Sequence, residues 1–201
     1  MGAPLEFWFE FASTYSYPAA MRVEDAARAA GVSLVWRPFL LGPIFGAQGW
    51  NDSPFNIYPT KGQYMWRDLE RICDALGVPL RRPSRFPRNS LLAARVALLG
   101  CDEAWGAAFV RGVYRANFGD DRDIADPTTV RDLVTEAGAD AEAVLATAQT
   151  PDNKDRLKRQ TESAIALGIF GAPSFVSRGE LFWGNDRLEA ALAWHRAHAD
   201  G

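Results

Sequence analysis

A short run of hydroxyl side chains is the first place in this sequence where chemistry could occur. Ser13-Thr14-Tyr15-Ser16 follows an apolar run and precedes a helical pattern, so it lies where a helix begins. Backbone N–H groups and the dipole at a helix start stabilise negative charge, including a thiolate. A serine hydroxyl that donates to a bound sulfur favours the ionised form of that sulfur. These hydroxyls could instead only cap the helix, which is a common role for serine and threonine.

The elements around this run follow from the apolar pattern. Apolar residues alternate between Leu5 and Phe11, which predicts a β-strand. A helix and a second strand come next, and this β-α-β unit implies parallel strands because a crossover joins them. A hairpin and a final helix follow near the end of the sequence. The predicted elements are strands over 5–11 and 32–37, a helix ending at Gly31, a hairpin over 173–183 and a last helix to about His198.

Between these flanking parts the sequence is mostly helical. Residues 40–60 lack periodicity and contain several glycines and prolines, so we expect a long, functional loop there. From Lys61 apolar residues recur at spacings of three and four, and helical stretches continue to about Leu167. A hairpin after a β-α-β unit is the layout of the thioredoxin fold, so we predict an α/β protein with a thioredoxin-like β-α-β…β-β-α fold. We place the thioredoxin-like domain at about 1–60 plus 149–201, and an all-helical insertion at about 61–148.

The fold gives a role to a second segment, Gly171-Ala172-Pro173-Ser174. A thioredoxin fold has a cis-proline at the start of its third strand, and Pro173 stands at that place. A cis bond there would leave the Ala172 N–H and C=O groups free to pair with an extended peptide, as a sheet edge does. An ordinary proline at a strand start is the alternative. A redox enzyme of this fold has Cys-x-x-Cys where this chain has Ser13-Thr14-Tyr15-Ser16. Without either sulfur this segment cannot exchange disulfides, but it can still hold another molecule's thiolate.

Composition and charge exclude several classes of function. The 201 residues include 22 Lys or Arg and 25 Asp or Glu, and the formal charge of −3 indicates neither a nucleic-acid partner nor an anionic membrane. The two cysteines, Cys73 and Cys101, lie outside any metal-ligand spacing, and we expect no metal. The sequence contains neither a signal peptide nor an apolar stretch of membrane-spanning length, so we expect a cytoplasmic protein.

Four blocks of residues resemble the 2-hydroxychromene-2-carboxylate isomerase family. That family belongs with the kappa-class glutathione transferases in the DsbA-like branch of the thioredoxin fold. The resemblance spans the whole chain and keeps the blocks in the same order, although Thr14 stands where the family usually has proline. The blocks are Phe9–Tyr17, Lys61–Leu69, Gly171–Ser174 and Trp183–Arg187.

The resemblance implies that glutathione is the cofactor. Ser13 matches the catalytic serine of the family and would activate the glutathione sulfur. Ala172 would pair with the cysteinyl backbone beside a cis-Pro173. Asn185 and Asp186 would hold the γ-glutamyl end, with Asp186 taking the ammonium group. Asp186 could instead simply cap the last helix.

The family also uses residues on the first helix of the insertion and in the loop before it. Lys61 would meet the glycine carboxylate of glutathione, and Asp68 lies on the same helical face two turns further on. Both could instead be part of a solvated helix face. Asn51 is the nearest match to the family's loop asparagine, and Asn56 competes with it.

Three further residues are candidates for contact with a flat, acidic substrate. Tyr64 and Trp66 would stack on an aromatic ring if they face the cleft, or would be core residues if they do not. Arg88, in a basic and proline-broken connector, would attract a carboxylate, or would belong to a solvated connector.

The resemblance implies a glutathione-dependent isomerase that interconverts 2-hydroxychromene-2-carboxylate and trans-o-hydroxybenzylidenepyruvate in aromatic catabolism, and it suggests a homodimer. A kappa-class-like transferase that conjugates glutathione to electrophiles is the main alternative, because both activities need the same activated sulfur. A peptide-binding module on the same scaffold would need no thiol. A thiol oxidoreductase is disfavoured because Cys-x-x-Cys is missing.

Overall fold

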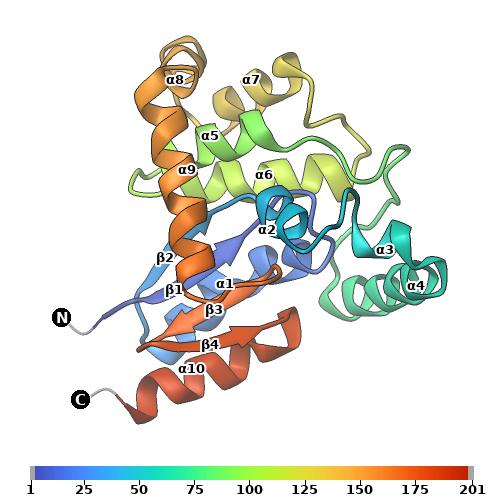
Figure 1. The fold of residues 1–201 in the computed structure, drawn as a ribbon. Helices are drawn as coiled ribbons and strands as arrows, with labels where there is room; N and C mark the ends of the chain where they lie inside the picture. Colours follow the sequence, from blue (N-terminus) through green and yellow to red (C-terminus); the bar gives the residue numbers. More distant parts are fainter. Residues whose placement is uncertain (1–2, 199–201) are drawn as a thin grey trace.

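A four-stranded mixed sheet lies at the centre of the computed structural model, which describes residues 3–198 (Figure 1). The strand order is β2-β1-β3-β4. Strand β1 (Leu5–Phe9) runs parallel to β2 (Leu34–Pro38) and antiparallel to β3 (Ser174–Ser177), which pairs with β4 (Glu180–Trp183). This order confirms the predicted α/β, thioredoxin-like arrangement of a β-α-β unit followed by a hairpin.

The sheet register stacks aromatic residues on one face. Phe7 lies opposite Trp36 on β2 and opposite Phe175 on β3, and the Phe7 and Phe175 rings stack with centroids 5.3 Å apart. Trp8 points to the other face and packs in a second buried cluster with Phe39. Both faces of β1 are therefore buried, which fits its central place in the sheet.

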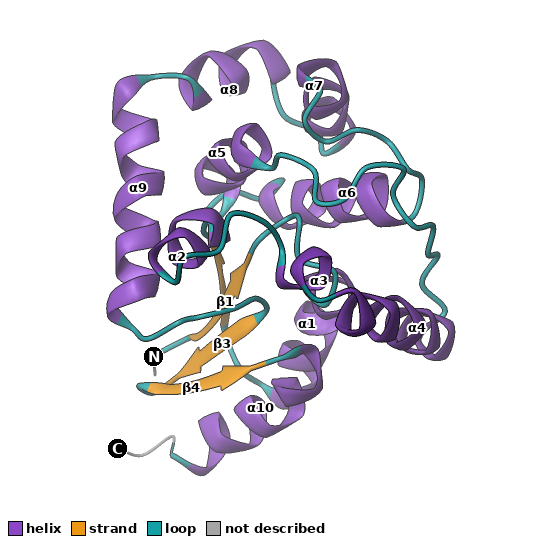
Figure 2. Cartoon of the chain, turned by 45° about the vertical axis from the view of Figure 1, so that its right-hand side comes forward, coloured by secondary structure: helices purple, strands orange, loops and turns teal. Residues whose placement is uncertain are grey.

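The helices form two groups around the sheet. Helix α1 (Ser16–Ala30) and helix α10 (Leu188–Ala197) pack against each other on one side of it. The second group is α5 (Leu91–Gly100), α6 (Gly106–Phe118), α7 (Pro127–Glu136) and α8 (Ala141–Ala148). Figure 2 shows these helices gathered at one end, with α9 (Pro151–Ala166) leading from them back to the hairpin. The remaining elements are α2 (Leu41–Ala47), α3 (Pro54–Ile57), α4 (Pro59–Leu76) and the 3-10 turn η1 (Asn185–Arg187).

The structure corrects the expectation of a long loop over 40–60. Two short helices, α2 and α3, lie in this segment, and α4 begins at Pro59. Helix α3 starts with Pro54 directly after Ser53, whose hydroxyl accepts the Phe55 N–H at 3.3 Å, and this is a regular helix start. Helices of four and seven residues are too short to show a repeating apolar pattern. The division into a domain over 1–60 plus 149–201 and an insertion over 61–148 stays a prediction.

Close packing of α5 against α6 produces the first testable prediction. A Cβ atom on Gly106 would lie 1.7 Å from the Gly100 carbonyl oxygen, which is a backbone atom and cannot move aside easily. We expect Gly106→Ala to lower the free energy of unfolding by about 1–3 kcal/mol, measured by urea denaturation. Gly112→Ala in the same helix is the control, because its Cβ would meet only the Leu133 side chain at 3.5 Å. The control should be neutral or gain up to about 1 kcal/mol from helix propensity, and equal losses in both variants would contradict the packing argument.

Candidate active site

The two segments singled out in the sequence meet in the structure. Ser13 lies between β1 and α1, and its hydroxyl donates to the Ala172 carbonyl oxygen at 2.8 Å. The peptide bond between Ala172 and Pro173 is cis, as the fold predicts. Ser13 is only partly buried, so its hydroxyl remains within reach of a ligand. This contact defines the centre of the candidate site.

The hydroxyl groups of this segment do not cap the helix. Helix α1 begins at Ser16, its N-cap residue is Tyr15, and no side chain makes a capping hydrogen bond. The Oγ atoms of Thr14 and Ser16 are buried without a hydrogen-bond partner. The alternative of Ser13 as a helix cap is therefore wrong, and its hydroxyl faces the cis-proline segment at the positive end of the α1 dipole.

The C-terminal end of the hairpin is hydrogen-bonded to the cis-proline segment. The Gly184 N–H donates to the Pro173 carbonyl oxygen at 2.9 Å, which places Asn185 and Asp186 directly after that bond. Asn185 is buried, and its Oδ1 accepts from Arg22 Nε at 3.1 Å. Asp186 is exposed and pairs with Arg187 at 3.3 Å without capping the helix. Its carboxylate is thus accessible to a cationic group.

Side-chain contacts join α4 to Tyr15, in the segment Ser13–Ser16. The Tyr15 hydroxyl donates to the Asp68 carboxylate at 3.1 Å, and the Tyr15 and Phe55 rings lie 6.2 Å apart. The Lys61 ammonium lies 5.7 Å from the centroid of the same Phe55 ring. Burial raises the pKa of Tyr15, and the neighbouring Asp68 raises it further, so the phenol keeps its proton. Lys61 and Asp68 are therefore connected to Tyr15, which lies two positions after Ser13.

The two candidate loop asparagines differ in their contacts. Asn56 Nδ2 donates to both carboxylate oxygens of Asp52 at 3.1 Å and to the Phe86 carbonyl oxygen at 3.2 Å. Asn51 is exposed to solvent. Asn56 therefore holds its own loop together, and Asn51 stays the predicted glutathione residue.

The structure corrects two of the three candidate substrate residues. Trp66 is only 9% exposed, and its ring contacts Phe86 and the Arg82 guanidinium, so it is a core residue rather than a stacking surface. Arg88 is 5% exposed, and its guanidinium donates to backbone carbonyls and to the Asp121 carboxylate. A substrate carboxylate would have to displace those partners, so Arg88 holds the surrounding loops instead. Tyr64 is 62% exposed and remains available to a ligand.

Glu10 is a residue near the site that the sequence analysis missed. It is 6% exposed, and its carboxylate accepts the Ala12 N–H at 3.0 Å and the Ser90 hydroxyl. Burial raises the pKa of Glu10 to about 7, although its hydrogen bonds oppose the shift. Glu10 therefore fixes the turn that leads to Ser13. A charged residue inside an apolar strand run was the signal that could have revealed it.

The pKa of Glu10 produces a prediction about stability and pH. Its value of about 7 in the folded state exceeds the ordinary 4.5, so the folded protein loses stability as pH rises between these values. The full shift corresponds to roughly 3 kcal/mol. We expect Glu10→Gln, which keeps an acceptor for Ala12, to be more stable than the wild type at pH 8 and similar to it near pH 5, measured by urea denaturation.

The control for this experiment is an exposed glutamate. Glu103→Gln on the surface should leave the pH profile of stability unchanged. A Glu10→Gln variant with the same pH profile as the wild type would show that Glu10 does not titrate in this range.

Comparison with known proteins identifies the family. A model of the DSBA-like thioredoxin domain matches residues 4–193, and the chain belongs to this family. A protein of Sphingobium xenophagum named 2-hydroxychromene-2-carboxylate isomerase is 32% identical over 94% of this chain and 96% of its own length. Human glutathione S-transferase kappa 1 is 28% identical, covering 92% of this chain and 87% of its own.

A solved structure confirms the fold. The structure of a 2-hydroxychromene-2-carboxylate isomerase superimposes with a TM-score of 0.84 at 28% sequence identity and covers 98% of both chains. The predicted resemblance and the DsbA-like fold class are therefore confirmed.

Residues 3–198 contain no helix that is both long and apolar enough to cross a membrane. The same residues contain no cluster of three or more side chains suited to hold a metal ion.

Proposed function

We propose that this protein is a glutathione-dependent isomerase that interconverts 2-hydroxychromene-2-carboxylate and trans-o-hydroxybenzylidenepyruvate. The observation that carries the proposal is the contact between the Ser13 hydroxyl and the Ala172 carbonyl beside cis-Pro173. Relatives named as isomerases, at 32% identity, support the choice of reaction. We further propose that it acts in aromatic catabolism, in the cytoplasm and as a homodimer, as the family resemblance implies.

The groups around Ser13 fit glutathione by their chemistry. Glutathione, when bound, supplies a thiolate nucleophile that is recovered unchanged after each turnover. Ser13 would donate a hydrogen bond to the sulfur, and the start of α1 would favour its negative charge. A tripeptide also needs a backbone partner, which the N–H and C=O groups of Ala172 would offer.

The present partner of Ser13 suggests how the site changes when it is loaded. A serine hydroxyl has one proton, and here it donates that proton to the Ala172 carbonyl at 2.8 Å. To stabilise a thiolate, Ser13 must turn its proton from this carbonyl to the sulfur. The carbonyl can then accept the N–H of an extended peptide ligand, so that both Ser13 and Ala172 stay hydrogen-bonded.

The remaining candidates would hold the two ends of glutathione. The exposed Asp186 carboxylate would take the γ-glutamyl ammonium, and Asn185, fixed by Arg22, would bind next to it. Lys61 would meet the glycine carboxylate, and Asn51 would contact glutathione from the loop before α3. Asp68 would act in the same region through Tyr15. Tyr64, which is 62% exposed, would stack on the aromatic ring of the substrate.

The similarity to glutathione S-transferase kappa 1 favours a second candidate function. A transferase would use the same Ser13 and the same thiolate but would leave the sulfur attached to the electrophile. Incubation with glutathione and a chlorinated nitrobenzene separates the two functions. Conjugation without isomerisation would favour the transferase.

The proposed role of Ser13 is tested by substitution. We expect Ser13→Ala to reduce glutathione-dependent conversion of 2-hydroxychromene-2-carboxylate by about 100- to 1000-fold in kcat, because a hydrogen bond to the reacting sulfur is lost. The ultraviolet spectrum of the substrate follows the reaction, with and without glutathione. Ser33→Ala, at an exposed serine, is the matched control and should keep full activity. Unchanged turnover in Ser13→Ala would refute the role of this serine.

A further inference from the structure

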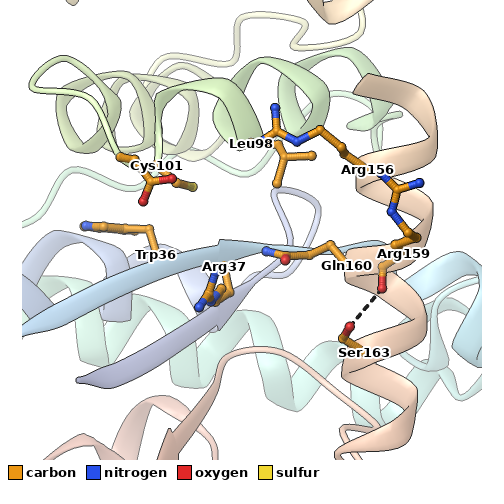
Figure 3. A pocket seen from close by; sticks show the side chains of 9 residues that line it. Trp36, Arg37, Leu98, Cys101, Arg156, Arg159, Gln160 and Ser163 are labelled. Atoms are coloured by element: carbon orange, nitrogen blue, oxygen red, sulfur yellow. Dashed lines mark hydrogen bonds between the residues drawn. The ribbon is translucent and has the colours of Figure 1, made fainter. Parts of the chain in front are cut away.

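A hollow with a volume of about 340 Å³ lies beside β2, the strand at one edge of the sheet. Strand β2, the end of α5 and helix α9 form its walls, and Figure 3 shows their side chains around it. None of the candidate glutathione residues lines this hollow. It is therefore separate from the proposed isomerase site and has no role in the proposed reaction.

Helix α9 presents a polar stripe to this hollow. Arg156, Arg159, Gln160 and Ser163 lie on one helical face, since their spacing is i, i+3, i+4 and i+7. The face of α9 that packs into the protein carries different residues. These are Asn153, Leu157, Thr161 and Ala164. The polar stripe therefore lines the hollow beside β2.

The charges on the walls are mostly positive. Arg156 and Arg159 lie one turn apart, and their like charges repel. In the part of the chain from 3 to 198, no carboxylate lies within ion-pair distance of either guanidinium. Arg37 faces them from β2 and is partly neutralised by Glu6 at 3.1 Å. Asp102 supplies the acidic group on the wall.

Cys101 lines the same hollow and is partly buried. Burial raises the pKa of Cys101 to about 12, and Asp102 contributes to the rise. Arg37 and Arg156 both oppose it, although they come from β2 and α9. Among the charged groups, Asp102 therefore acts on this thiol more strongly than either guanidinium does.

We propose that this hollow binds a small anion that carries at least two negative charges. Guanidinium groups bind planar carboxylates and phosphates with paired hydrogen bonds, and two unpaired arginines call for a ligand with two acidic oxygens or groups. A phosphate compound and a small dicarboxylate share this chemistry. The ligand neutralises the Arg156 and Arg159 pair.

The test measures binding of inorganic pyrophosphate and of succinate by isothermal titration calorimetry at fixed ionic strength. The variant is Arg156→Gln/Arg159→Gln. The matched control is Lys154→Gln/Lys158→Gln, which removes the same charge from the same helix but at side chains that line a different hollow. Thermal melting of each variant without ligand verifies that it folds.

We expect the wild type and the lysine control to bind one of the two probes, and the arginine variant to bind it at least about tenfold more weakly. The probe that binds tells whether the ligand is a phosphate compound or a dicarboxylate. Equal weakening in both variants would show general charge attraction and overturn the proposal. Absence of binding to the wild type at millimolar concentrations of both probes would also overturn it.

Discussion

The antiparallel pairing of β1 with β3 is the constraint on which the rest of the site depends. It joins the two ends of the sequence, so that Ser13 and Ala172, which are 159 positions apart, share a hydrogen bond of 2.8 Å. The stacked Phe7 and Phe175 rings hold this pairing from the core side. Without it the start of α1 and the cis-proline segment would not meet, and the proposed site for a thiol peptide would not form.

A second constraint acts on the turn between β1 and α1. Glu10 is buried beneath this turn, and its carboxylate accepts the Ala12 N–H at 3.0 Å. Tyr114 on α6 donates to the Glu10 carbonyl oxygen at 2.9 Å, and Asn117 on the same helix donates to the Phe11 carbonyl oxygen at 3.0 Å. The helices inserted between the two parts of the sheet therefore position the turn that carries Ser13. An ionisable residue with a pKa of about 7 in this place makes the turn sensitive to pH.

The sequence predicted the parts of the fold that have a strong pattern. The first strand followed from apolar alternation, and the hairpin followed from the turn between two apolar runs. Most of the longer helices followed from apolar spacings or from the residues at their ends. Helices α2 and α3 were not predicted because they are too short to repeat a pattern.

Two residues were wrongly predicted to contact the substrate because their side chains are amphipathic. Only the structure shows that Trp66 packs against Phe86 and that Arg88 pairs with Asp121. Glu10 was missed because its burial depends on residues from α5 and α6 that are distant in the sequence.

The pKa of the glutathione thiol bound to the protein tests the central claim most directly. The ultraviolet absorbance of the thiolate, followed against pH, reports this pKa for the wild type and for Ser13→Ala. We predict a pKa well below the ordinary thiol value of about 8.5 in the wild type, and a return toward that value in Ser13→Ala. A bound thiol that titrates like free glutathione in both proteins would contradict the claim that Ser13 and the start of α1 stabilise a thiolate.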